Sequence, residues 1–192
     1  MKVILLCFLL LPNISFAVDC NILTEDQISN LKMAYTIGQK ITFNNDHFGE
    51  TIASILWQET KAGCEKYRSN GFIVGDKNRK GKPKSLGLMQ VQIRAARDVE
   101  KWYPKIFEKE FGKNYSPTNE ELLIRLLIQP EFNISVGAAY YKKMLSIKKN
   151  WRKSILAYNR GAGNDGKDPN NYVKRVIKWR KLIVQKNIVY LK

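Results

Sequence analysis

The sequence predicts a mainly helical globular domain with one small β excursion. Apolar residues recur at helical spacing along most of the 192 residues, and helix-capping residues precede several of these stretches. A stretch rich in glycine and lysine, residues 63–84, interrupts the helical pattern. Apolar residues make up 44 % of the chain and charged residues 26 %, which is typical of a chain with a core and argues against disorder or a coiled coil. No internal repeat is visible, so we expect one domain over residues 18–192.

Two helices are predicted in the N-terminal part. Thr24 and Gln27 form a capping-box pattern directly before the first apolar helical stretch. Asp46 is expected to cap the second helix. The apolar residues that share one face of this second helix are Ile52, Ile55 and Leu56.

The rest of the chain is predicted to be helical apart from two loops. Residues 72–74 are the candidate strand inside the first loop, and residues 161–170 form the second loop. A basic amphipathic helix over residues 171–192 closes the chain. The signals for the intervening helices are the pattern of residues 94–102, Thr118 with Glu121 as a capping box, Pro130 at a first helical position and Asn150 as a cap.

The first 17 residues are predicted to be a secretory signal peptide. Lys2 precedes an apolar run from Val3 to Leu11, and Ala17 ends a small-x-small cleavage pattern. The run is shorter than the roughly 20 apolar residues of a membrane-spanning helix. A retained N-terminal anchor is the alternative. We therefore expect an exported protein of the periplasm or cell envelope.

Two cysteines, Cys20 and Cys64, remain after such a cleavage. An even pair in an exported protein is typical of one disulfide, and two free buried thiols are the alternative. One histidine and so few cysteines leave too few ligands for a zinc site. We therefore expect no metal and no cofactor.

The charge is strongly positive, with 33 Lys and Arg against 17 Asp and Glu. This balance favours a polyanionic partner, such as nucleic acid, an anionic membrane or an acidic cell-wall polymer. We expect no nucleic acid, because the chain is predicted to be exported and carries no zinc-finger or RNA-recognition motif. The C-terminal basic helix has the composition of a membrane-surface helix, but packing of its apolar face on the core is the more common arrangement.

Glu59 is the most informative candidate for chemistry. It lies on the same face of the second predicted helix as the apolar residues named above. Desolvation favours the neutral form of a carboxyl, and a neutral acid near pH 7 can protonate a glycosidic oxygen. On this pattern alone, a glutamate that reaches solvent at a helix end is the more common interpretation.

Two further stretches carry groups suited to sugar binding. The first runs from Ser85 to Gln90, where Gly87 permits close backbone approach and Gln90 supplies an amide. In the second, Tyr158 and Asn159 close a helix ahead of a glycine-containing loop. Each stretch alone is more often structural than functional.

Five elements follow one another along the chain: Glu59-Thr60, Gly87-Leu88-Met89-Gln90, Asn133-Ile134 with Gly137 and Tyr140, Ala157-Tyr158-Asn159-Arg160-Gly161, and Tyr172-Val173. In this order they resemble the soluble lytic transglycosylase family, within the broad lysozyme-like group, over residues 48–176. The resemblance is strongest to small single-domain members that accompany secretion or conjugation machines or phage particles. It implies a lysozyme-like helical domain.

The resemblance implies cleavage of the β-1,4 bond between N-acetylmuramic acid and N-acetylglucosamine in peptidoglycan. Glu59 would act as acid and then as base, and a 1,6-anhydro ring would close on the muramic acid. The implied partners are peptidoglycan glycan strands and a secretion, conjugation or phage apparatus, for a monomeric enzyme. The implied substrate-binding residues are Ser85, Gly87, Leu88, Met89, Gln90, Tyr158, Asn159 and Tyr172.

Hydrolysis of the same bond is the alternative chemistry. The resemblance extends to goose-type lysozymes, which use an added aspartate to position water. Asp76, in the loop after Glu59, is the candidate for that role. Its glycine and lysine neighbours are typical of a solvated loop aspartate, which is the more common case.

Overall fold

A computed structural model describes the chain at residues 20, 23–42, 45–77, 79, 81, 83–164, 166–168 and 170–190. The expected signal peptide, residues 1–17, lies outside these described residues. The described part contains eight α-helices and a small two-stranded antiparallel sheet, which confirms the predicted fold class. None of the helices in this part is both long and apolar enough to cross a membrane.

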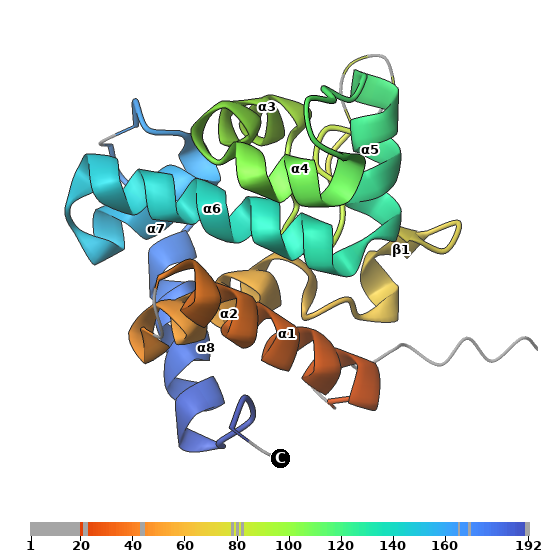
Figure 1. Cartoon of the computed structure of the whole chain (residues 1–192). Helices are drawn as coiled ribbons and strands as arrows, with labels where there is room; N and C mark the ends of the chain where they lie inside the picture. Colours follow the sequence, from red (N-terminus) through yellow and green to blue (C-terminus); the bar gives the residue numbers. More distant parts are fainter. Residues whose placement is uncertain are drawn as a thin grey trace, which may run out of the picture.

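The helices pack around one apolar core. In Figure 1, α6 crosses the middle of the molecule, with α3, α4 and α5 on one side and α1, α2 and α8 on the other. Helix α2 packs against both α1 and α8, and α6 packs against α1, α3, α5 and α7. The elements are α1 (Glu25–Ile41), α2 (Asp46–Thr60), the 3₁₀ turn η1 (Glu65–Tyr67), β1 (Arg68–Ser69), β2 (Phe72–Ile73), α3 (Ile93–Trp102), α4 (Pro104–Phe111), α5 (Asn119–Ile128), α6 (Pro130–Lys148), α7 (Trp151–Arg160) and α8 (Tyr172–Gln185).

Most of the predicted helix starts are confirmed. Thr24 and Thr118 both form complete capping boxes, and Asn150 caps α7. The prediction for α2 is wrong by one residue, because Asn45 accepts the N–H of Phe48 and is the cap. Asp46 is the first helical residue, where a carboxylate is favoured by the helix dipole.

Two other boundaries differ from the expectation. Helix α4 restarts the chain at Pro104, directly after α3, although no helix is predicted there from the sequence. Proline suits this first helical position because its ring presets φ and its missing N–H is not needed. Helix α8 ends at Gln185 and turns follow over residues 186–190, so it is shorter than the expected 171–192.

The expected strand at residues 72–74 is confirmed for Phe72 and Ile73, which form β2. It pairs with β1 in the register Arg68 with Ile73. Val74 continues into an isolated antiparallel bridge with Leu86. The hairpin therefore leads the chain from the end of α2 to the stretch that begins at Ser85.

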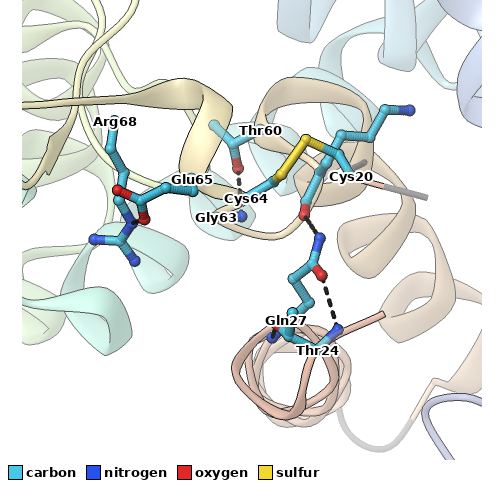
Figure 2. The surroundings of a disulfide bond; sticks show 9 residues. Cys20, Thr24, Gln27, Thr60, Gly63, Cys64, Glu65 and Arg68 are labelled. Atoms are coloured by element: carbon cyan, nitrogen blue, oxygen red, sulfur yellow. Dashed lines mark hydrogen bonds and ion pairs between the residues drawn. A yellow bond between two sulfur atoms is a disulfide. The ribbon is translucent and has the colours of Figure 1, made fainter. Parts of the chain in front are cut away.

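A disulfide joins Cys20 to Cys64, with 5.7 Å between the two Cα atoms (Figure 2). This is the pairing expected from the sequence. Near it, the amide of Gln27 donates to the carbonyl of Lys61 at 2.7 Å. The amide of Asn30 donates to the carbonyl of Ala62 at 2.9 Å. The turn that follows α2 is thus fixed to Cys20 by a covalent bond and to α1 by two hydrogen bonds.

Candidate active site

Glu59 lies one residue before the end of α2 and its side chain meets the N-terminal end of α8. The hydroxyl of Tyr172 donates to Oε1 of Glu59 over 2.5 Å. Tyr172 is buried and begins α8. The carboxylate of Asp168 fixes this start by accepting the backbone N–H groups of Tyr172 at 2.7 Å and Val173 at 2.8 Å. An acidic group that accepts the first N–H groups of a helix stabilises its start, so Asp168 holds the tyrosine in place.

The surroundings of Glu59 raise its pKa to about 7. The main cause is burial, which disfavours the charged carboxylate. The hydrogen bond from Tyr172 and the charge of Arg175 oppose this rise, whereas the charge of Asp76 adds to it. Near pH 7 the carboxyl therefore exists in both protonation states, as an acid that later acts as a base requires.

The stretch from Leu86 to Val91 is a tight turn whose two ends form backbone hydrogen bonds with each other. Gly87 has φ +66°, and an added Cβ there would lie 2.3 Å from Nδ2 of Asn133. Asn133, on α6, donates to the carbonyl of Leu86 at 2.8 Å and accepts the N–H of Met89 at 2.8 Å. Only glycine fits this turn, because both the backbone conformation and the space exclude a side chain.

Two hydroxyl groups fix this turn beside Glu59. Thr60, the next residue of α2, donates to the carbonyl of Leu88 at 2.9 Å. Tyr158, on α7, donates to the carbonyl of Met89 at 2.7 Å. The threonine at position 60 therefore uses its hydroxyl to join the end of α2 to the turn, and the buried tyrosine joins α7 to the same turn.

Gln90 ends the turn with its amide held in a defined position. Its backbone has φ +50°, which is uncommon for a residue with a side chain. Its Nε2 donates to the carbonyl of Gly87 at 2.8 Å, and its Oε1 accepts from the hydroxyl of Ser85 at 3.0 Å. Gly75 lies against this pair, since an added Cβ would come 1.8 Å from Oε1 of Gln90.

A cleft of about 1080 Å³ opens in front of Glu59. An aromatic series runs along it, in which Tyr140 lies 5.8 Å from Tyr158 and 6.3 Å from Trp102 between ring centroids. Planar rings of this kind suit the apolar faces of sugars, and the cleft exceeds the usual size of a small-molecule pocket. The charged side chains on its wall include Asp76, Arg94, Asp98 and Arg160.

The cleft brings together five of the nine residues expected to act on or bind substrate. These five are Glu59, Ser85, Gln90, Tyr158 and Asn159. Leu88 and Met89 are buried, and with Gly87 and Tyr172 they are not among the residues that line the cleft. Tyr172 instead contacts the carboxyl of Glu59, and the other three form the supporting turn.

Two contributors to the site were not among the residues expected from the sequence to bind substrate. Asn133 stands in the resembling motif, but its function depends on tertiary contacts, because two of its hydrogen bonds hold the turn and a third joins it to Leu126 on α5. Trp102 ends α3 and reaches the cleft through the packing of α3 on α6. An aromatic residue at a helix end is a weak signal, because most such residues belong to the core.

Residues 44–180 match the transglycosylase SLT domain family, a range that contains the 48–176 resemblance noted in the sequence. No curated protein and no solved structure shows significant similarity to the chain. The family match covers most of the chain and includes every residue of the cleft described above. The protein therefore belongs to the transglycosylase SLT domain family, and this membership implies cleavage of peptidoglycan of the transglycosylase or lysozyme type.

Proposed function

We propose that the protein is a peptidoglycan lytic transglycosylase that cleaves the β-1,4 bond between N-acetylmuramic acid and N-acetylglucosamine and leaves a 1,6-anhydro-muramic end. The observation that carries this proposal is the environment of Glu59, a carboxyl with a pKa near 7 at the wall of a long cleft. A phenol hydroxyl contacts it, and no basic side chain pairs with it within the described residues. This environment suits a group that must gain and lose a proton in one catalytic cycle.

Glu59 performs two proton transfers in this mechanism. Its protonated carboxyl donates to the glycosidic oxygen as the bond to the muramic C1 breaks, and the N-acetyl carbonyl of the substrate stabilises the cationic carbon. The resulting carboxylate accepts the proton of the muramic 6-hydroxyl as that oxygen bonds to C1. The hydrogen bond from Tyr172 stabilises the carboxylate between the two steps. The enzyme is thus returned to its starting protonation state without water.

The remaining expected residues act in two ways in this proposal. Gln90, Ser85 and Asn159 present polar groups to the cleft for the sugar hydroxyl and acetamido groups. The turn that positions Gln90 is formed by Gly87, Leu88 and Met89. A hydrogen bond from Tyr158 on α7 fixes this turn. We further infer action outside the cytoplasm, in the periplasm or cell envelope, since disulfides are typical of such compartments.

Hydrolysis of the same bond is the second candidate, and one observation favours it. Asp76 lines the same cleft as Glu59, and its charge contributes to the raised pKa of that carboxyl. Its backbone carbonyl accepts the N–H of Lys84 at 2.6 Å, which gives the loop a defined geometry there. A second carboxylate that activates water is what a hydrolytic mechanism needs.

Product analysis separates the two reactions. Purified peptidoglycan is digested and the released muropeptides are measured by mass spectrometry together with a reducing-end assay. Anhydro products are lighter by one water and lack a new reducing end, and they are expected from both the wild-type protein and Asp76→Asn. Reducing muramic ends that disappear in Asp76→Asn would instead establish a lysozyme. A protein that releases neither product would overturn both candidates.

A further inference from the structure

Three cationic side chains gather where α8 meets the end of α2, beside the cleft. Arg175 and Lys178 are exposed on α8, and Lys61 follows the last residue of α2. The guanidinium of Arg175 donates to the carbonyl of Asn170 at 2.6 Å, and Asn170 lines the cleft. The charge of Arg175 acts on both Glu59 and Lys61. These three residues, here called the cation cluster, therefore begin at the rim of the cleft and lead away from it.

An aromatic platform holds the cation cluster in place. Nζ of Lys61 lies 3.7 Å from the centre of the Trp179 ring, and Nζ of Lys178 lies 5.4 Å from the same ring. The Trp179 ring donates its N–H to Gln58 at 3.0 Å and meets the Trp57 ring edge-on at 6.0 Å. Attraction between the ammonium groups and the ring faces orders two long side chains that would otherwise move freely.

Among the described residues, the cation cluster has no anionic partner. Within the part of the chain that the structure describes, no carboxylate lies at ion-pair distance from Lys61, Arg175 or Lys178. Burial and the neighbouring charges of Arg175 and Lys178 lower the pKa of Lys61 to about 8. Like charges held together in this way repel one another, and a bound anion would relieve the repulsion.

We propose that Lys61, Arg175 and Lys178 form a binding site for the carboxylates of the peptide that peptidoglycan carries on its muramic acid. This inference rests on the proposed function, because it takes peptidoglycan as the substrate in the cleft. Lys178 lies six positions after Tyr172, which contacts Glu59, so the cation cluster reaches about 9 Å along α8 from that contact. A peptide of about three extended residues spans the same distance. A muramic acid bound at Glu59 would thus place its peptide carboxylates along the cation cluster.

The test compares two soluble glycan oligomers of equal length, one with its peptides and one from which an amidase has removed them. Affinities are measured at 0.15 M salt with Glu59→Gln protein, so that the ligand is not consumed. The wild-type cluster is expected to bind the peptide-bearing oligomer about tenfold more tightly, the order of one charge-assisted hydrogen bond. The pair Arg175→Gln and Lys178→Gln, introduced together, is expected to reduce this preference to near one.

The matched control is the pair Lys174→Gln and Lys181→Gln, which removes the same charge from exposed positions on the same helix. It is expected to retain the preference. Equal binding of both oligomers by the unmodified cluster, or loss of the preference in the control pair, would overturn the site and leave the proposed cleavage untouched. Absence of binding to either oligomer, together with absence of cleavage by the wild-type protein, would refute the proposed function itself.

Discussion

Helix α2 carries two carboxylates that face α8, and the two are surrounded very differently. Glu50, near the start of α2, is buried and forms an ion pair with Arg180, while the hydroxyl of Tyr190 donates to its other oxygen at 2.5 Å. Glu59, near the end of α2, receives the hydroxyl of Tyr172 and has no ion-pair partner among the described residues. Because α2 and α8 run antiparallel, both contacts come from the same partner helix, eight residues apart.

The difference shows how one helix pair holds both a structural and a reactive acid. At Glu50 a guanidinium forms an ion pair that joins the two helices. At Glu59 a neutral phenol supplies one hydrogen bond, and the charge of Arg175 acts without an ion-pair contact, so burial dominates and the pKa of Glu59 rises. Both carboxyls accept a tyrosine hydroxyl, and the difference is the arginine that pairs with Glu50. Without such a partner among the described residues, the carboxyl of Glu59 can exchange a proton near pH 7.

Replacement of the reactive acid is expected to have the largest effect. Glu59→Gln should lower the rate of peptidoglycan cleavage by about 10²–10⁴-fold, the usual contribution of general acid–base catalysis. The circular dichroism spectrum should be unchanged, because the amide keeps the shape of the side chain. Glu65→Gln, at an exposed position after the same helix, is the control and should retain activity. Clearing of peptidoglycan by Glu59→Gln at a rate near wild type would remove this residue from the mechanism.

The disulfide next to the Glu59 end of α2 should contribute to the stability of the protein. Replacing Cys20 and Cys64 together by serine is expected to lower the free energy of unfolding by about 2–4 kcal/mol, the typical loss for one disulfide. Denaturant unfolding of the wild-type protein with and without reductant provides the comparison. The double variant should be insensitive to reductant. If reductant also left the free energy of unfolding of the wild-type protein unchanged, the cross-link would contribute nothing to stability.

The structural acid should affect stability rather than chemistry. Glu50→Gln leaves Arg180 with no opposite charge and is expected to reduce the free energy of unfolding by about 2–3 kcal/mol, below the usual range because Arg180 is partly exposed. Activity measured well below the unfolding temperature should stay near wild type. Thermal unfolding and initial rates on the same preparation test both parts. An unchanged stability would mean that the ion pair only balances its own desolvation.

The reactive acid should also make the stability of the protein depend on pH. The pKa of Glu59 is raised from 4.5 to about 7, so the folded chain keeps a proton that the unfolded chain loses over this interval. The stability that this group contributes is therefore full below pH 4.5 and is lost as the pH rises to about 7. The free energy of unfolding of Glu59→Gln, relative to that of the wild type, should therefore rise by about 2–3 kcal/mol between pH 4.5 and pH 8. Parallel stability curves over this range would contradict the raised pKa.

The smallest effect should come from the phenol itself. Cleavage needs protonated Glu59, so kcat/KM should fall as the pH rises through about 7. The hydrogen bond from Tyr172 lowers this pKa, and Tyr172→Phe should move the alkaline limb upward by about 0.5–1 pH unit. Tyr158→Phe, whose hydroxyl contacts Met89, should leave the position of the limb unchanged even where it alters the rate. A downward shift in Tyr172→Phe would be inconsistent with this geometry.

Local signals in the sequence sufficed for the fold class and for most helix starts. Thr24, Thr118 and Asn150 act on residues three positions away, so their function is visible without tertiary structure. The restart at Pro104 was missed because only a single residue separates α3 from α4, and their patterns merge. The predicted cap of α2 was wrong by one residue, because Asn45 and Asp46 are adjacent and either side chain suits the cap position.

The candidate site was predictable only in part, since its geometry arises between distant segments. The apolar face before Glu59 pointed to a desolvated carboxyl, and its raised pKa agrees with that inference. The sequence did not reveal that Tyr172 contacts Glu59, because the two residues are 113 positions apart and the start of α8 determines where Tyr172 lies. The burial of Leu88 and Met89 likewise depends on the hydrogen bonds that hold the turn against Asn133 and Tyr158.

Three glycines limit how the wall of the cleft can vary. Gly75, Gly87 and Gly137 come from three different segments, and an added Cβ at each would lie within 3 Å of Gln90, Asn133 or Met89, respectively. An enlarged side chain at any of them would displace the turn that carries Gln90. Mutational tolerance should therefore be lowest on this wall and higher at the exposed cleft residue Arg94. Redesign of the enzyme for a different glycan or peptide has its accessible positions at the rim rather than beside the reactive acid.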